Sequence, residues 1–397
     1  MNSSLFLRAF SELGSAEARM RAIGVCEAAV GIMAPKMRHF VFMVRDLDPR
    51  AANILKQEML AVGGEAATSY HVICDLSKAT DCLLSGTERQ FSIAIPKMAS
   101  QPFGLSALAT DLECAIKTLA SPCRRAFGPL ELGNKTHVMG ILNVTPDSFS
   151  GDGITDIQTA VDRGIAMASQ GADVIDVGGE STRPGAARLS PEEEIDRVIP
   201  VIEALAKRID VPISIDSRDP TVVSAALNAG ASIVNLVGGI RTDEMARVLA
   251  ETEAPVILMH MQGEPDTMQH NPEYKDVMDE IISEFRQQMA TALDAGIKPE
   301  NIALDPGIGF GKTPEHNLEI LHRLGELRIL GMPIVIGTSR KSFIGKVLSA
   351  EPKDRLEGSI ASAVLASAHG AGIVRVHDVA ESIKALKISN EIMREKY

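Results

Sequence analysis

The chain has 397 residues, of which 45% are hydrophobic and 23% charged, the balance of a soluble globular protein with a substantial core. Its net charge of −12 comes without a basic stripe, so we expect no nucleic-acid partner, and an anionic ligand would need a local cluster of Arg, Lys or helix N-termini. No apolar run approaches the roughly 18 residues of a membrane-spanning helix, and the N-terminus lacks a secretory pattern, so we expect a cytoplasmic protein.

Residues 1–120 predict a small α/β domain with a modest core of its own. Residues 40–44 are typical of a strand, and residues 48–62 predict a helix that ends at a glycine pair. We expect a further strand at 92–95 and a further helix at 105–119. All five cysteines lie in the first 123 residues without a CxxC pair, which favours buried free thiols over metal ligands. Residues 121–132 are the expected linker, and no function is assigned to 1–120.

From residue 133 to 397, short apolar runs alternate with helical patterns. Runs that are apolar nearly throughout are typical of parallel strands buried on both faces. Eight such runs occur, at 138–144, 173–179, 212–216, 232–238, 255–260, 301–306, 333–339 and 372–377. Repeated strand–helix units build an open doubly wound sheet or a closed barrel, and eight units in about 260 residues favour the (β/α)8 TIM barrel.

The second helix of this series has clear start signals. Ser190 predicts an N-cap, Pro191 occupies the first helical position, and Glu193 completes a capping box. An apolar stripe with helical spacing follows over 195–205.

Polar residues gather where the predicted strands end. They are Asn143, the run 180–183, Asp216, Asn235, His260, Asp305, the run 339–341, and Arg375 with His377. One polar residue after a buried strand could merely cap the next helix, but here all eight strands are followed by one. Catalytic groups of TIM barrels come from these strand ends, so we expect an active site there. Arg375 and His377 lie two residues apart, on one side of an extended strand, which favours a common ligand.

The motifs at these strand ends resemble those of dihydropteroate synthases. They are MGILNVTPDSFS (139–150), DVGGESTRPGA (176–186), ISIDS (213–217), IVN (233–235), LMHMQG (258–263), DPGIGFGK (305–312), GTSRKSFIG (337–345) and RVHDV (375–379). The resemblance covers essentially all of 133–397, and residues 1–120 resemble the extension of longer bacterial members. It implies that the enzyme, a transferase of folate biosynthesis, joins 6-hydroxymethyl-7,8-dihydropterin pyrophosphate to 4-aminobenzoate and releases pyrophosphate.

The resemblance also implies which residues bind each part of the substrates. The pterin pocket would contain Asp216, Asn235, Met259, Asp305 and Lys341, whose carboxylates, amide and ammonium suit the polar edge of a pterin. The pyrophosphate would contact Asn143, Arg183, Arg375 and His377, with Mg2+ held by Asn143. The 4-aminobenzoate would contact Phe149, Thr182, Pro184, Phe310 and Ser342. We expect Asp216, Asp305, Lys341, Arg375 and His377 to be catalytic, in a dissociative substitution without a covalent enzyme intermediate.

Two positions depart from the family's pattern. Gly151 precedes Asp152 in the first loop, where the family usually has the aspartate directly, and Leu236 follows Asn235, where an aspartate is common. The loops at 145–153 and 182–189 are expected to close over the site. The late helix over 360–371, rich in Ala and Ser, is the expected contact of a homodimer.

Other functions stay open from the sequence. A pterin-dependent methyltransferase acting with a corrinoid protein would use the same aspartates and Asn235, but it would not need Arg183, Arg375 or His377. A Schiff-base aldolase using Lys341 would be trapped by borohydride. A non-catalytic binding role is most plausible for residues 1–120.

Overall fold

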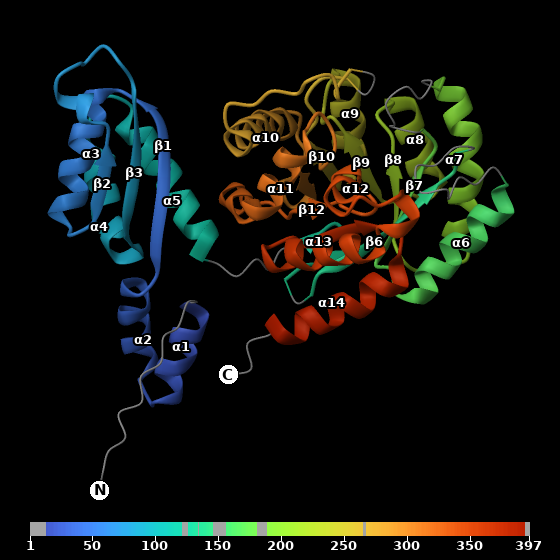
Figure 1. The fold of residues 1–397 in the computed structure, drawn as a ribbon, viewed down its shortest axis with the longest axis horizontal. Coiled ribbons are helices and arrows are strands. Elements are labelled where there is room, and N and C mark those ends of the chain that lie inside the picture. Colours follow the sequence, from blue (N-terminus) through green and yellow to red (C-terminus); the bar gives the residue numbers. More distant parts are fainter. Residues whose placement is uncertain are drawn as a thin grey trace, which may run out of the picture. The chain divides into compact units, whose positions relative to one another are not determined.

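A computed structural model describes the chain except for residues 1–12, 121–125, 134, 146–155, 181–188, 265–266 and 394–397, and it leaves out the side chains of 13–16. The chain divides into two compact units, the first ending at Ala120 and the second running from Ser121 to Met393 (Figure 1). Within the described residues, no helix is both long enough and apolar enough to span a membrane.

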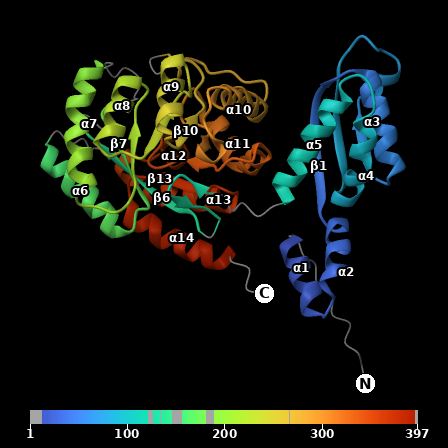
Figure 2. The same cartoon turned by 180° about the vertical axis from the view of Figure 1, so that it is seen from behind.

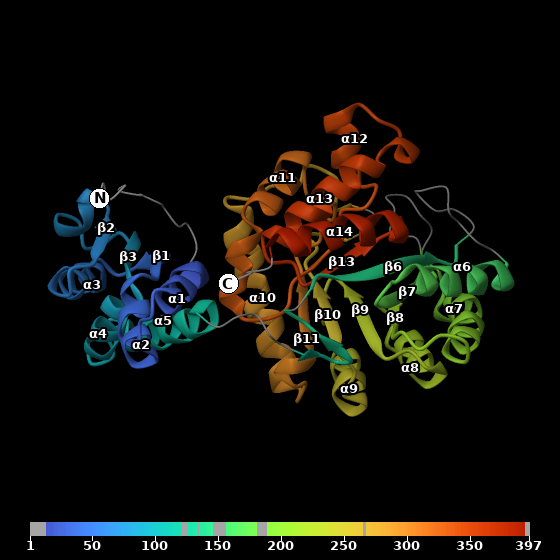
Figure 3. The same ribbon diagram turned by 90° about the horizontal axis from the view of Figure 1, so that it is seen from below.

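The first unit is a three-stranded antiparallel sheet covered by helices. The strands run in the order β1 (His39–Leu47), β3 (Thr80–Thr87) and β2 (Glu65–Thr68). Helices α3 (Pro49–Ala61) and α4 (Glu88–Met98) pack on one face of the sheet, and α5 (Leu105–Ala120) packs against α4 (Figure 3). Before the sheet come α1 (Leu13–Ala22), α2 (Glu27–Met33) and a 3-10 turn (Ala34–Lys36). The strand predicted at 40–44 and the helices predicted at 48–62 and 105–119 are confirmed.

The strand predicted at 92–95 is wrong, because these residues lie inside α4. Thr87 and Gln90 form a capping box in which each side chain accepts a hydrogen bond from the other residue's backbone, and this begins the helix. Phe91, Ala94 and Met98 then face the core with helical spacing. A short apolar run fits either a strand or a buried helix, and here the cap decides for the helix.

Four of the five cysteines lie in the described part of the chain, and all four are free thiols. Cys82 is buried on β3, where burial raises the pKa of its thiol to about 11. Cys26, Cys74 and Cys114 are exposed, so the prediction that the thiols are buried is wrong for three of the four.

The second unit is an eight-stranded parallel barrel, as predicted. Its strands are β6 (His137–Asn143), β7 (Val174–Gly178), β8 (Ile213–Asp216), β9 (Ile233–Val237), β10 (Val256–Met259), β11 (Ile302–Asp305), β12 (Val335–Ile336) and β13 (Ile373–Val376). They are hydrogen-bonded in the order β11-β10-β9-β8-β7-β6-β13-β12. A parallel bridge between Leu304 and Ile334 brings β11 to the residue just before β12 and closes the barrel. All eight predicted strands are confirmed.

Helices surround the barrel, as the view from below shows (Figure 3). They are α6 (Ile157–Gln170), α7 (Pro191–Ala206), α8 (Pro220–Ala229), α9 (Asp243–Thr252), α10 (Val277–Asp294), α11 (Pro314–His322), α12 (Ser342–Leu348), α13 (Leu356–Ala368) and α14 (Val379–Met393), with 3-10 segments at Pro299–Asn301, Leu324–Leu330 and Pro352–Asp354. Helix α7 begins with the predicted capping box of Ser190 and Glu193.

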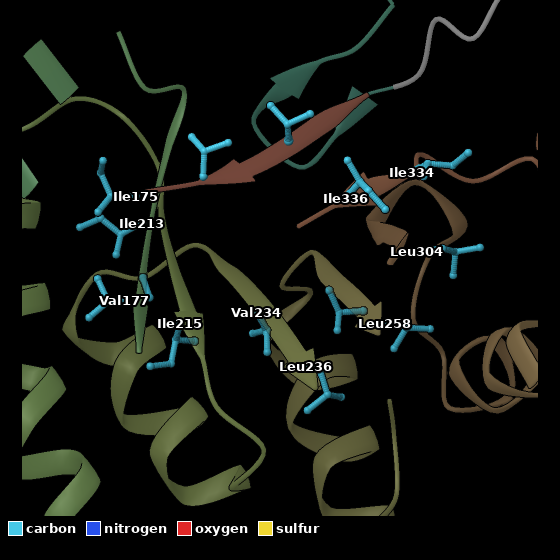
Figure 4. Close-up of a cluster of buried hydrophobic side chains, with 14 of the residues drawn as sticks. Ile175, Val177, Ile213, Ile215, Val234, Leu236, Leu258, Leu304, Ile334 and Ile336 are labelled. Atoms are coloured by element: carbon cyan, nitrogen blue, oxygen red, sulfur yellow. The ribbon is translucent and has the colours of Figure 1, made fainter. Parts of the chain in front are cut away.

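The two sides of the barrel strands carry different core clusters. Strand residues such as Ile175, Val177 and Ile215 pack with the surrounding helices (Figure 4). A second cluster lies at the amino-terminal ends of the strands and comprises Phe127, Leu130, Leu132, Met139, Val174, Ile233, Ile257, Ala303, Val335 and Ile373. Because side chains alternate along a strand, this second cluster fills the interior of the barrel.

Within the segment predicted as a linker, 121–132, the described residues 126–132 contain secondary structure that belongs to the barrel unit. Strands β4 (Ala126–Phe127) and β5 (Leu130–Glu131) form a short antiparallel hairpin. Phe127 is fully buried in the interior cluster, and Leu130 and Leu132 join it. These apolar side chains close the amino-terminal end of the barrel, which leaves the carboxyl end for the site.

Candidate active site

A layer of mostly polar side chains lies inside the barrel, between the interior apolar cluster and the carboxyl ends of the strands. The residue two positions after an interior apolar residue points to the same side of the strand. Applied to the interior cluster, this rule places Asp176, Asn235, Met259, Asp305 and Arg375 inside the barrel. Asn143 and Asp216, the last residues of β6 and β8, share this orientation. The structure thus brings together six predicted site residues and adds Asp176.

Arg375 is the centre of this layer because it bridges two carboxylates. Its Nε donates to Asp176 Oδ2 at 2.6 Å, and its Nη2 donates to Asp216 Oδ2 at 2.6 Å. Burial alone would lower the pKa of Arg375, but Asp176 and Asp216 raise it above its ordinary value. For Asp216, burial raises the pKa while the Arg375 guanidinium opposes the rise. The arginine therefore stays charged and stabilises the fully buried carboxylate of Asp176 and the largely buried carboxylate of Asp216.

Asp176 is a site residue to which the sequence analysis gave no role. Its side chain is fully buried, and Oδ2 also accepts from Asn235 Nδ2 at 3.1 Å. Its other oxygen, Oδ1, has no hydrogen-bond partner among the described residues. The sequence contains a signal for this role, because burying a lone carboxylate within an apolar strand costs free energy unless the carboxylate is paired.

Asp305 ends β11 and is held by the glycine loop that follows it. Its Oδ1 accepts from the backbone N–H of Gly307 at 2.7 Å. Gly307 has a φ of 68°, and a Cβ there would lie 2.0 Å from the carbonyl oxygen of His260. Burial raises the pKa of Asp305, while the Gly307 amide and the Lys341 charge oppose the rise. Only glycine allows this loop to lie so close to the end of β10.

Lys341 and Phe310 form a second part of the site. Lys341 is the N-cap residue of α12, and its Nζ lies 4.3 Å from the centroid of the Phe310 ring. Burial lowers the pKa of Lys341 to about 8, and Arg375 adds to this effect while Asp305 and Asp216 oppose it. Phe310 also packs in an apolar cluster with Met259 and Met261. A flat ring could therefore lie between an apolar wall and polar groups.

The other predicted residues are placed less centrally. The backbone N–H of His377 donates to Ser339 Oγ at 3.2 Å, and its Nδ1 lies 3.0 Å from the same oxygen. Ser342 is exposed at the first position of α12. Asn143 belongs to the inward layer and is half-buried. The residues outside the described part of the chain are Phe149, Gly151, Asp152, Thr182, Arg183 and Pro184, together with most of both predicted loops.

Leu236 belongs to the cluster between strands and helices, so its side chain faces away from the barrel interior. The departure from the family's aspartate therefore leaves the inward-facing Asn235 unaffected.

A family model described as pterin binding enzyme matches residues 139–377. The dihydropteroate synthase of Escherichia coli K12 is 49% identical to this chain over 253 residues, which are 64% of this chain and 90% of that protein. The chain belongs to the dihydropteroate synthase family. A solved dihydropteroate synthase from Clostridium difficile, studied in the presence of pteroic acid, is 48% identical, with a TM-score of 0.63 over 67% of this chain and 100% of that one.

The first unit also has relatives in the dihydropteroate synthase family. A Halobacterium salinarum protein described as "Probable bifunctional folylpolyglutamate synthase/dihydropteroate synthase" is 40% identical over 358 residues. The match covers 90% of this chain and 43% of that protein. Since the barrel alone is a smaller share of this chain, the similarity extends into the first unit.

Proposed function

We propose that the barrel condenses 6-hydroxymethyl-7,8-dihydropterin pyrophosphate with 4-aminobenzoate to give dihydropteroate and pyrophosphate. The observation that carries this proposal is the inward polar layer, in which carboxylates, an amide and two cations meet at the carboxyl ends of the strands. That set suits a substrate with a polar heteroaromatic edge at one end and an anionic leaving group at the other.

The pterin would lie between the Met259–Phe310 wall and the inward polar groups. A pterin edge carries an amino group and ring N–H donors, which Asp305 and Asp216 can accept, and acceptors that Lys341 can donate to. Asn235 donates one Nδ2 hydrogen to Asp176, which leaves its second Nδ2 hydrogen to donate to the pterin and its Oδ1 to accept from it. Buried partners of this kind select strongly for the matching ligand, because a ligand that lacks one group leaves a buried polar atom unpaired.

The pyrophosphate would be bound by Arg375, His377 and Asn143, with Arg183 as a further prediction. Arg375 uses Nε and Nη2 for its carboxylate partners, and its Nη1 makes no hydrogen bond to another described residue, so it can donate to a phosphate oxygen. The amide oxygen of Asn143 is the kind of hard oxygen ligand that Mg2+ takes from proteins while it keeps several waters. Bound Mg2+ would neutralise charge on the leaving phosphates.

The substitution would be dissociative. Loss of pyrophosphate leaves a cationic methylene conjugated with the pterin, and the nearby Asp216 and Asp176 carboxylates would stabilise that charge. The amine of 4-aminobenzoate then attacks the methylene carbon, and its proton leaves to pyrophosphate or solvent. Phe310 and Ser342 would contact the aminobenzoate, while contacts with Phe149, Thr182 and Pro184 stay predictions. No covalent bond to the enzyme is needed.

The alternatives are less well supported. The pterin-dependent methyltransferase is not favoured, because the dihydropteroate synthases of Escherichia coli K12 and Synechocystis are 49% and 47% identical to the barrel part of this chain. If Lys341 formed a Schiff base with the substrate, borohydride would reduce it and leave a covalent adduct on the protein. We expect none by mass spectrometry.

A homodimer is the proposed assembly, through α13 and α14, which lie side by side (Figure 2). Leu365 on α13 and Ile388 and Ile392 on α14 are exposed by 57%, 65% and 77%, which is apolar surface that a second subunit could cover. Ile388→Glu should shift the sedimentation coefficient of the protein to that of a monomer. The cytoplasmic location stays a prediction from the sequence.

The activity is tested by supplying both substrates with Mg2+ and measuring pyrophosphate release. Asp305→Asn and Lys341→Ala should each lower turnover roughly a hundred-fold or more without loss of the thermal transition. Asp294→Asn, at an exposed position at the end of α10, is the matched control and should leave turnover unchanged. Absence of pyrophosphate release by the folded wild-type protein would refute the proposal.

A further inference from the structure

Lys312, the residue that ends the glycine loop after β11, is almost entirely buried, with 3% of its surface exposed. A lysine in that position costs free energy unless its ammonium group is hydrogen-bonded and its charge is balanced. Neither its motif nor the proposed substrate contacts give it a role. Its environment therefore needs an explanation of its own.

The ammonium of Lys312 contacts two partners that belong to the site's framework. Its Nζ donates to the backbone carbonyl of Phe310 at 2.9 Å and lies 2.9 Å from His260 Nδ1. The other ring nitrogen of His260, Nε2, lies 3.2 Å from Glu284 Oε2 on α10. A continuous chain of polar groups thus runs from the Phe310 peptide to the partly exposed Glu284.

The protons in this chain can be assigned from chemistry. A lysine ammonium only donates, so His260 Nδ1 must accept and its proton must lie on Nε2, from which it is donated to Glu284. Burial lowers the pKa of His260 to about 2, and the charge of Lys312 adds to this effect. The imidazole is therefore neutral. It accepts a hydrogen bond from Lys312 at Nδ1 and donates one to Glu284 from Nε2.

Charged groups from several elements face Lys312. Burial lowers the pKa of Lys312 to about 7, while Asp305 and Glu284 oppose the shift and Lys341 adds to it. Burial raises the pKa of Glu284, against the charges of Lys312 and Arg241. Tyr274, from the segment before α10, donates its hydroxyl to the carbonyl of Gly311 at 2.8 Å, next to Lys312 in the chain.

The same framework touches both sides of the proposed pterin pocket. The backbone N–H of His260 donates to the Asp305 carbonyl at 2.9 Å. The carbonyl that Lys312 holds belongs to Phe310, whose ring lies against Lys341 Nζ. Movement of the Phe310 peptide would therefore move the ring and the lysine that it supports.

We propose that Lys312 is a positioning residue for pterin binding, which fixes the Phe310 peptide and places a compensating positive charge beside Asp305. It contacts no substrate atom in this proposal and acts through Phe310, Lys341 and Asp305. The inference rests on the pterin site proposed above. Its consequence is that pterin affinity depends on a charge buried behind the pocket wall.

The test is Lys312→Met, which keeps the length of the side chain and removes the charge. The KM for the pterin pyrophosphate should rise about ten-fold or more, the factor expected when a buried charged hydrogen bond is lost, and it should rise more than the KM for 4-aminobenzoate, which Phe310 also contacts. The pH below which pterin binding weakens should also move upward, because Asp305 is easier to protonate without the neighbouring ammonium. Lys298→Met, at an exposed lysine of the same barrel, is the matched control and should change neither value.

Glu284→Gln tests the same chain at a position that tolerates change, because a third of its side chain is exposed. The amide oxygen can still accept from His260, but without the negative charge Lys312 loses its proton at lower pH. The pterin KM should therefore begin to rise at a lower pH than in the wild type. This variant decides the question if Lys312→Met gives no thermal transition.

The inference is overturned if folded Lys312→Met keeps the wild-type pterin KM and pH profile, or if Glu284→Gln leaves the pH profile unmoved where Lys312→Met does not fold. Asp305→Asn separates this outcome from a failure of the proposed site. If Asp305→Asn abolishes pterin binding while the Lys312 and Glu284 variants bind normally, only the role of Lys312 is wrong. If Asp305→Asn also binds pterin normally, the site itself is wrong.

Discussion

Replacing Arg375 by methionine should destabilise the barrel in a strongly pH-dependent way. Methionine fills much of the same space, but it leaves the fully buried Asp176 carboxylate and the largely buried Asp216 carboxylate without their cation. Breaking one side of a buried ion pair typically costs about 3–5 kcal/mol. The folded variant can avoid the uncompensated charge only by taking up a proton.

The magnitude follows from the cost of that proton. An unfolded aspartate has a pKa of about 3.9, so protonating one carboxyl in the folded state costs about 4 kcal/mol at pH 7 and about 1.5 kcal/mol at pH 5. The folded-state pKa of the carboxyl is raised in this variant, so the stability it contributes is present at low pH and lost as pH rises towards that pKa. With about 2–4 °C per kcal/mol for a unit of this size, the melting temperature should fall by roughly 10 °C at pH 7 and by roughly 4 °C at pH 5.

Differential scanning calorimetry of Arg375→Met and wild type at both pH values measures this effect. Arg247→Met removes an arginine from an exposed ion pair with Glu251 on α9 and should leave the melting temperature within error at both pH values. A melting temperature of Arg375→Met equal to that of the wild type at pH 7, or an equal loss at pH 5 and pH 7, would refute the reasoning.

Three further predictions concern the surroundings of the site. Gly307→Ala should lower both the melting temperature and the pterin affinity, since its Cβ would meet the His260 carbonyl. Gly296 also has a positive φ but lies in open space, so Gly296→Ala should lower the melting temperature only slightly, through backbone strain. Burial raises the pKa of Glu194 to about 7, so wild-type stability should fall as pH rises from about 4.5 to 7, and Glu194→Gln should reduce that fall in calorimetry. Because burial lowers the pKa of Lys341 to about 8, the pterin KM should rise as pH passes through 8, and Lys341→Met should lose this rise while it keeps the earlier one near pH 7 that Lys312 causes.

The barrel was predictable because its strands are buried on both sides. Each of the eight predicted runs is an apolar stretch of five to seven residues, and each overlaps a strand of the structure, although the run at 333–339 contains only the two-residue strand Val335–Ile336. The prediction of a strand at residues 92–95 was wrong because it rested on the same kind of short apolar run. A short apolar run has no periodicity of its own, and the Thr87–Gln90 capping box that decides its structure lies outside it.

The positions of the site residues followed from the strand ends, but their partners did not. Arg375 was predicted as a pyrophosphate ligand, and the structure joins it to Asp176 and Asp216. Those contacts arise because β13 and β6 lie side by side when the barrel closes, while β7 and β8 follow on the other side of β6. A pattern in the sequence gives the direction of a side chain along its own strand and not the strand it will face.

The residues that the sequence analysis passed over have one property in common. Asp176, Glu194 and Lys312 each have an ionisable side chain that is at least 95% buried, and Asp176 and Lys312 lie where the chain is otherwise apolar or glycine-rich. A charge in such a segment cannot reach water, so the fold must supply a partner or shift its pKa. Asp176 has Arg375, Lys312 has His260, and Glu194 has its pKa raised by burial. A charge out of place in an apolar segment is therefore a better guide to the framework of the site than its presence in a motif.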